Sequence, residues 1–204
     1  MDTGKLQKNS VEILNKIIES VRNSEGRVKP QSLVCAVGAV AGYACRYDII
    51  REYGVEKGLP EDSIFNVVFD KSGKKYFFGE LLDNLLVKDK FSLWGFAGGA
   101  VAHLKAKLPD IEGILKYVSI SAGKDNFGCV RSADTEKNPQ EYLEKLWNFI
   151  LPDAKKVCET GEIHILLGMC LQKSIVACSE AFNVTELCRI AMESGIICAR
   201  AGKV

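Results

Sequence analysis

Residues 33–45 read LVCAVGAVAGYAC, a run of thirteen positions that carry no charge and are mostly small. A helix without a polar face must be covered by other elements on every side. Gly38, Gly42 and the alanines would let those elements approach closely, because small residues leave room for a neighbouring backbone. The run therefore predicts a buried helix at the centre of the fold.

Helical signals surround this central segment on both sides. Pro30 suits the first turn of the central helix, which we expect to end at Tyr53, before Gly54. An amphipathic helix is expected ahead of it, starting near Asn9 or Ser10, because apolar residues recur there at steps of three and four. The same spacing predicts later helices at 79–87, 91–108, 139–152 or beyond a kink at Pro152, 162–182 and 184–199.

Two regions have the character of β-structure instead. The segments SIFNVVFD (63–70) and KKYFFGE (74–80) flank a Lys-Ser-Gly turn and predict a hairpin. The segment LKYVSISAG (115–123) alternates well enough for another strand, and NFGCVRS (126–132) could pair with it. We therefore expect one globular domain over 1–204, of predominantly helical α+β class, with small-residue-rich buried helices packed on a small antiparallel sheet or hairpin.

The two small-residue helices, 33–45 and 91–104, raise the question of what each one packs against. Glycine faces shorten the distance between helix axes on either partner, so these helices could pack on each other or on copies of themselves. The sequence leaves both arrangements open. Because the last two helices are also strongly apolar, we expect a homodimer that completes the core.

Composition excludes several classes of partner. The chain has 204 residues, 47% of them hydrophobic, and a net charge of +1, with neither half strongly charged. This balance argues against a nucleic-acid partner. The first ten residues, MDTGKLQKNS, lack the apolar segment of a secretory signal. Thirteen apolar residues also fall short of the roughly 20 that cross a membrane, so we expect a cytoplasmic protein without a membrane partner.

Two lysine-containing segments merit comparison with anion-binding motifs. Lys71, Lys74 and Lys75 cluster without interleaved aromatic residues that would stack bases, which favours a solvated turn. The segment SISAGKDNFG (119–128) lacks the GxxxxGK[ST] spacing with which backbone amides wrap a phosphate. Neither segment predicts a nucleotide site.

The cysteines are expected to be reduced core residues. Six of the eight lie in apolar runs: Cys35, Cys45, Cys170, Cys178, Cys188 and Cys198. Free cysteine behaves as a small hydrophobic residue that suits close helix packing. Because the chain has no CxxC motif and only two histidines, we expect neither a metal site nor a cofactor.

The two histidines are the main candidates for chemistry. His164 precedes the apolar run ILLGMC and would share a helix face with Gly168, so it is expected to be buried. It could act as a general base or activate a thiol, or it could simply bond a backbone carbonyl. His103 lies near Gly99 and more than two turns after Trp94, where either a ligand pocket or an ordinary packing groove could form.

Polar residues at the end of the central helix are a third candidate. Arg46 and Asp48 stand where we expect this helix to reach solvent. Side chains at that position could form the floor of a pocket, but any helix that emerges from a core shows the same pattern.

Two hypotheses of function follow. The first is a non-catalytic homodimeric binding or interaction protein, with a mainly apolar interface or a cavity for a small apolar ligand. The scarcity of catalytic spacings favours it. The alternative is a small-molecule enzyme in which His164 or His103 acts as acid or base, with or without help from a cysteine thiol.

Overall fold

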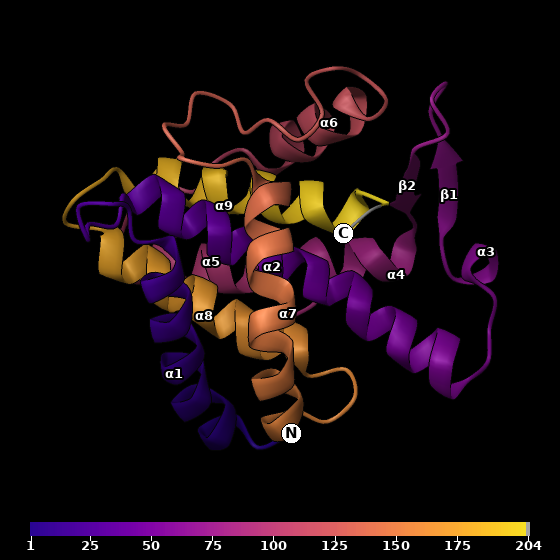
Figure 1. Cartoon of the computed structure of the whole chain (residues 1–204), viewed down its shortest axis with the longest axis horizontal. Helices are drawn as coiled ribbons and strands as arrows, with labels where there is room; N and C mark the ends of the chain where they lie inside the picture. Colours follow the sequence, from indigo (N-terminus) through magenta and orange to yellow (C-terminus); the bar gives the residue numbers. More distant parts are fainter. Residues whose placement is uncertain (203–204) are drawn as a thin grey trace.

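The structure, a computed structural model, describes residues 1–202 and confirms the predominantly helical α+β class (Figure 1). Helices make up 66% of the chain, and the sheet has two antiparallel strands. The α-helices are α1 Thr3–Val21, α2 Pro30–Ile49, α3 Glu61–Ile64, α4 Glu80–Asp83, α5 Leu93–His103, α6 Ile111–Ser121, α7 Pro139–Val157, α8 Ile163–Cys178 and α9 Val184–Arg200. Two π-helical segments, η1 Ile50–Glu56 and η2 Asn84–Lys88, extend α2 and α4, and the strands are β1 Asn66–Phe69 and β2 Lys75–Phe78.

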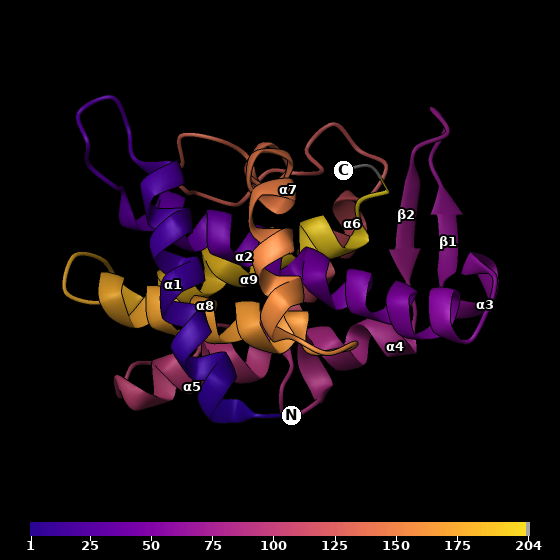
Figure 2. The same ribbon diagram turned by 60° about the horizontal axis from the view of Figure 1, so that its bottom comes forward.

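Helix α2 is the central element that the sequence predicts. Figures 1 and 2 both show it inside a layer of helices, and it packs against α9, α8, α7 and α1. Residues 32–42 are all buried. The apolar face of α1 and one face of α7 are buried and cover part of α2.

The closest packing in the fold joins α2 to α9. Gly38 lies against the backbone of Ala191, and Gly42 lies against the backbone of Gly195. Gly38 and Gly42 are four residues apart on α2, and Ala191 and Gly195 are four residues apart on α9. The two rows of small residues therefore face each other along the helix contact. The question that the sequence left open, what each small-residue helix packs against, has another answer: α5 packs on α8 and α9, and α9 supplies the small residues that face α2.

The predicted hairpin is confirmed, with the register Asn66↔Phe78 to Phe69↔Lys75. It stands at one end of the molecule in both views (Figures 1 and 2). Phe77 is buried, and Tyr76, buried as well, forms an isolated bridge to Ala201 after α9. The sheet thereby contacts the residue that follows α9.

The second pair of predicted strands is wrong, because residues 111–121 form helix α6. Asp110 caps this helix by accepting the amide of Gly113 at 3.0 Å. Ile114 and Val118, four residues apart, are buried on one face. A capped segment with this spacing satisfies its backbone within the helix, whereas a strand here would need a partner.

Several helix boundaries differ from the prediction. Helix α1 starts at Thr3 because Asp2 accepts the amide of Lys5 at 3.0 Å. Helix α5 ends at His103, since Lys105 adopts a left-handed φ of 54°, and Leu108 beyond it is 47% exposed. The central helix passes Tyr53 and continues to Glu56, and α7 continues through Pro152 to Val157.

The six cysteines of the apolar runs are buried free thiols, as predicted, while Cys129 is exposed and Cys158 is half-buried. By length and composition alone, the continuous helix Pro30–Glu56 could cross a membrane. However, 83% of its apolar window is buried inside the protein, as in the core helix of a compact fold. The absence of a membrane partner stays a prediction.

Candidate functional site

The structure brings together two of the predicted residues, Asp48 and His164, which are 116 positions apart in the chain. Nδ1 of His164 lies 2.8 Å from Oδ2 of Asp48, and the backbone N–H of His164 donates to the same oxygen at 2.8 Å. Both side chains are buried, with 3% of Asp48 and 7% of His164 exposed. The prediction that Asp48 reaches solvent is therefore wrong.

The pair is positioned by the meeting of two helix ends. Asp48 lies in the last turn of α2, and His164 is the second residue of α8. The first amides of a helix have no partner within it, and the side chain of Glu162 does not cap them. Asp48 thus caps α8 from a different helix, where a negative charge also interacts favourably with the helix dipole.

This geometry determines which ring nitrogen of His164 can react. A carboxylate only accepts hydrogen bonds, so Nδ1 must carry the proton that it shares with Asp48. The neutral ring then has its lone pair on Nε2. Nε2 makes no hydrogen bond to residues 1–202. The surrounding residues do not completely bury this atom.

His164 and Asp48 line a cavity of about 320 Å³, which we call the His164 cavity. Its wall comes from the end of α2, η1, α4, η2 and the loop before α8. Hydrogen-bond acceptors are supplied by Glu52, Asn84 and Asp89, and apolar surface by Ile49, Leu81 and Leu85. Among the described residues, no lysine or arginine lines it, so the cavity suits a neutral or cationic molecule.

A second hollow, of about 380 Å³, lies on another side of Asp48 and includes Arg51, Lys155 and Cys158. Burial, reinforced by the charges of Asp48 and Glu162, raises the pKa of the Cys158 thiol to about 12. The thiol is therefore protonated at neutral pH, which argues against a nucleophilic cysteine beside the pair.

Thiol reactivity checks this conclusion. In the native protein at neutral pH, Cys129 should react quickly with Ellman's reagent, while the buried thiols and Cys158 should react only after unfolding in urea. Absorbance would count the reacted thiols, and peptide mapping would identify them. Rapid labelling of Cys158 would instead support a mechanism in which this thiol acts as a nucleophile.

Arg46 has a structural position rather than a place at the cavity. Only 4% of Arg46 is exposed, so the expectation that it reaches solvent is wrong. The guanidinium carbon lies 4.8 Å from the centre of the Tyr43 ring and 4.6 Å from the centre of the Phe77 ring. The guanidinium N–H group donates a hydrogen bond to the carbonyl of Ala201. Burial lowers the pKa of Arg46. The side chain ties α2 to the hairpin and the end of α9.

The remaining predicted residues lie elsewhere. His103 is exposed at the end of α5 and lines a different hollow, together with Gln172 and Val176 of α8. Gln172 is eight residues after His164, about 12 Å along the helix. Trp94 and Gly99 are half-buried on α5. The structure therefore does not join His103, Trp94 or Gly99 to the Asp48–His164 pair.

Glu52, another polar residue of the His164 cavity, follows Asp48 by one helical turn, and this four-residue spacing places both carboxylates on one helix face. The sequence did not predict the other two polar residues, Asn84 and Asp89. Asn84 and Asp89 come from η2 and the residues after it, and no local pattern links them to α2 or α8. Their positions follow from the packing of α4 and η2 against the central helix.

Comparisons with known proteins were made at the level of families, sequences and folds. No protein-family model, curated protein or solved structure matches this chain.

Proposed function

We propose that the protein is a small-molecule enzyme in which His164 transfers a proton to or from a molecule bound in the His164 cavity. One observation carries this proposal: Asp48 orients the imidazole and leaves Nε2 as the nitrogen without a hydrogen bond to residues 1–202. A carboxylate that bonds the far nitrogen of a histidine is the arrangement that acid–base catalysis uses.

The proposed step balances with the groups present. Nε2 accepts a proton from an O–H or N–H group of the bound molecule, and the ring becomes an imidazolium. Asp48 stabilises that positive charge through the Nδ1–H bond without taking the proton. The imidazolium then returns its proton from Nε2 to the atom that gains negative charge later in the reaction.

The lining of the cavity indicates the class of substrate. Glu52, Asn84 and Asp89 offer acceptors, and Ile49, Leu81 and Leu85 offer apolar contact. A volume of about 320 Å³ is at the small end of ligand sites. We therefore propose a small alcohol or amine with a short apolar portion as the substrate.

The non-catalytic homodimer is the competing proposal. The face of α2 that suggested close association is covered by α9 within the same chain, so this face supplies no interface. The site beside Asp48 is also mixed in polarity rather than mainly apolar. Dimerisation and a cytoplasmic location stay predictions, although the free thiols suit a reducing compartment.

The proposal can be tested before the substrate is identified. The protein is incubated with a pooled library of small alcohols and amines, and mass spectrometry records which compounds are consumed. His164→Gln should abolish the change, while His103→Gln, the only other histidine variant the chain offers, should leave it intact.

Asp48→Asn separates catalysis from simple binding. An amide can reverse the orientation of the ring, so turnover should fall by about 10⁴-fold, the loss known for an orienting aspartate in another enzyme, while ligand uptake persists. Uptake without turnover in the unmodified protein would instead support the non-catalytic binding protein.

A further inference from the structure

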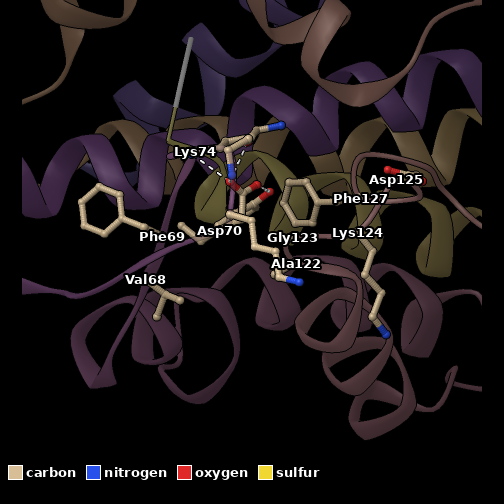
Figure 3. A pocket seen from close by; sticks show the side chains of 12 residues that line it. Val68, Phe69, Asp70, Lys74, Ala122, Gly123, Lys124, Asp125 and Phe127 are labelled. Carbon is tan, nitrogen blue, oxygen red and sulfur yellow. Dashed lines mark hydrogen bonds between the residues drawn. The ribbon is translucent and has the colours of Figure 1, made fainter.

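The hairpin forms one wall of a second candidate site, which we call the hairpin pocket, far from the Asp48–His164 pair in the sequence. Its volume is about 690 Å³, and its walls are residues 68–72, 74 and 76 of the hairpin and residues 122–125 and 127 after α6 (Figure 3). The two walls meet where Phe127 packs edge-on against Tyr76, with ring centres 4.9 Å apart. The hairpin pocket shares no lining residue with the His164 cavity.

Three lysines from two separate parts of the chain line this pocket. Lys71 and Lys74 come from the hairpin turn, and Lys124 comes from the segment after α6. Within residues 1–202, none of the three forms an ion pair with a carboxylate. In Figure 3 the Phe127 ring lies between Lys74 and Lys124, so positive charge flanks an aromatic surface.

The carboxylate of Asp70 offsets only part of this charge, and its hydrogen bonds are made within the hairpin rather than to a lysine ammonium group. It accepts the amides of Ser72 and Lys74 at 2.8 and 3.0 Å, the Ser72 hydroxyl at 2.6 Å and the Tyr76 hydroxyl at 3.1 Å. These bonds, of which the Ser72 hydroxyl contributes most, lower the pKa of Asp70 to about 2. Asp125 is the other carboxylate of the wall, so three lysines still exceed two acids.

Apolar surface completes the pocket. Val68 is 51% exposed and lies opposite Tyr76 in the hairpin, so its side chain is on the face that carries Tyr76 and Phe127. Lys74 Nζ lies 5.4 Å from the centre of the Phe127 ring, close enough for a cation–π interaction. An aromatic face, an exposed valine and unpaired ammonium groups thus line one hollow.

We propose that the hairpin pocket binds a small organic anion with a flat apolar portion, such as an aromatic carboxylate, sulfonate or phosphate ester. The lysines interact with the anionic group, and Val68 and Phe127 contact the apolar portion. The volume lies in the range of small-molecule sites. The proposal does not depend on the function of the Asp48–His164 pair.

Adjacent lysines provide a matched test. Lys74 lines the pocket, whereas Lys75 pairs with Glu61 at 2.6 Å and is not part of the wall. Titration with 8-anilinonaphthalene-1-sulfonate, followed by fluorescence, would measure affinity in the full chain. Lys74→Gln and Lys124→Gln should each weaken binding by about 2-fold to 5-fold, the effect of one exposed ion pair, and Lys75→Gln should not.

Two further probes separate charge from apolar contact. N-phenyl-1-naphthylamine, which lacks the sulfonate, should bind equally to the unmodified protein and to Lys74→Gln. Inorganic phosphate, which lacks the apolar portion, should compete poorly. Equal losses for Lys74→Gln and Lys75→Gln would overturn the proposal, as would amide shift changes that map away from Gly123 and Lys124. Circular dichroism would verify that each variant remains folded.

Discussion

Replacing Gly42 by alanine should destabilise the protein by about 3 kcal/mol or more. A methyl group at this position would overlap the backbone of Gly195, which cannot rotate away as a side chain can. The two helices would have to separate, and the contacts along the whole α2–α9 interface would weaken. Unfolding in urea, followed by circular dichroism, would measure the change.

Gly99→Ala is the matched control for this experiment. Gly99 lies in the helical part of α5, and its nearest neighbour would be the side-chain amide of Gln172 at an ordinary 3.5 Å. Because alanine favours the helix over glycine, this variant should gain about 0.5–1 kcal/mol. If Gly42→Ala were as stable as Gly99→Ala, the close approach of α2 to α9 would be wrong.

Replacing Asp48 by alanine should cost about 2–5 kcal/mol of unfolding free energy, because the change leaves two buried donors of His164, the backbone N–H and Nδ1–H, without their acceptor. Each unpaired buried donor costs about 1–3 kcal/mol. The N-terminus of α8 also loses its negative charge. Unfolding in urea would measure the loss.

Asp134→Ala provides the comparison at the surface. Asp134 pairs with Lys29 at 3.1 Å, but its side chain is 78% exposed. An exposed ion pair contributes about 0–1 kcal/mol, so this variant should be nearly as stable as the unmodified protein. A double-mutant cycle of Asp48→Ala with His164→Ala should show coupling of about 0.5–3 kcal/mol. Additive losses would show that the two residues do not interact.

The central helix and the hairpin could be predicted because their signals are local. An uncharged run of small residues has no stable position except inside a core, and two β-branched and aromatic segments around a glycine turn favour pairing with each other. The sequence of the segment LKYVSISAG is compatible with either a strand or a helix. Its helix was decided by the cap at Asp110 and by burial of Ile114 and Val118 against other elements.

The candidate site could be predicted only in part. His164 and Asp48 were separately recognisable as polar residues at the ends of apolar segments, but their contact depends on how α8 meets α2. Arg46 could not be placed from the sequence for the same reason. Its charge predicts exposure to solvent, but its guanidinium group lies against the rings of Tyr43 and Phe77. Lys124 and Lys74 likewise line one pocket only because the segment after α6 packs on the hairpin.

Nitrogen NMR shows directly which ring nitrogen of His164 carries a proton. A long-range ¹H–¹⁵N spectrum of the native protein near neutral pH would contain signals from only two histidines, His103 and His164. We predict that Nδ1 of His164 carries the proton shared with Asp48, and that the Nε2 signal shifts when a small alcohol or amine binds. A ring protonated on Nε2 but not on Nδ1 would contradict this orientation, because Nε2 would then have no lone pair with which to accept a proton.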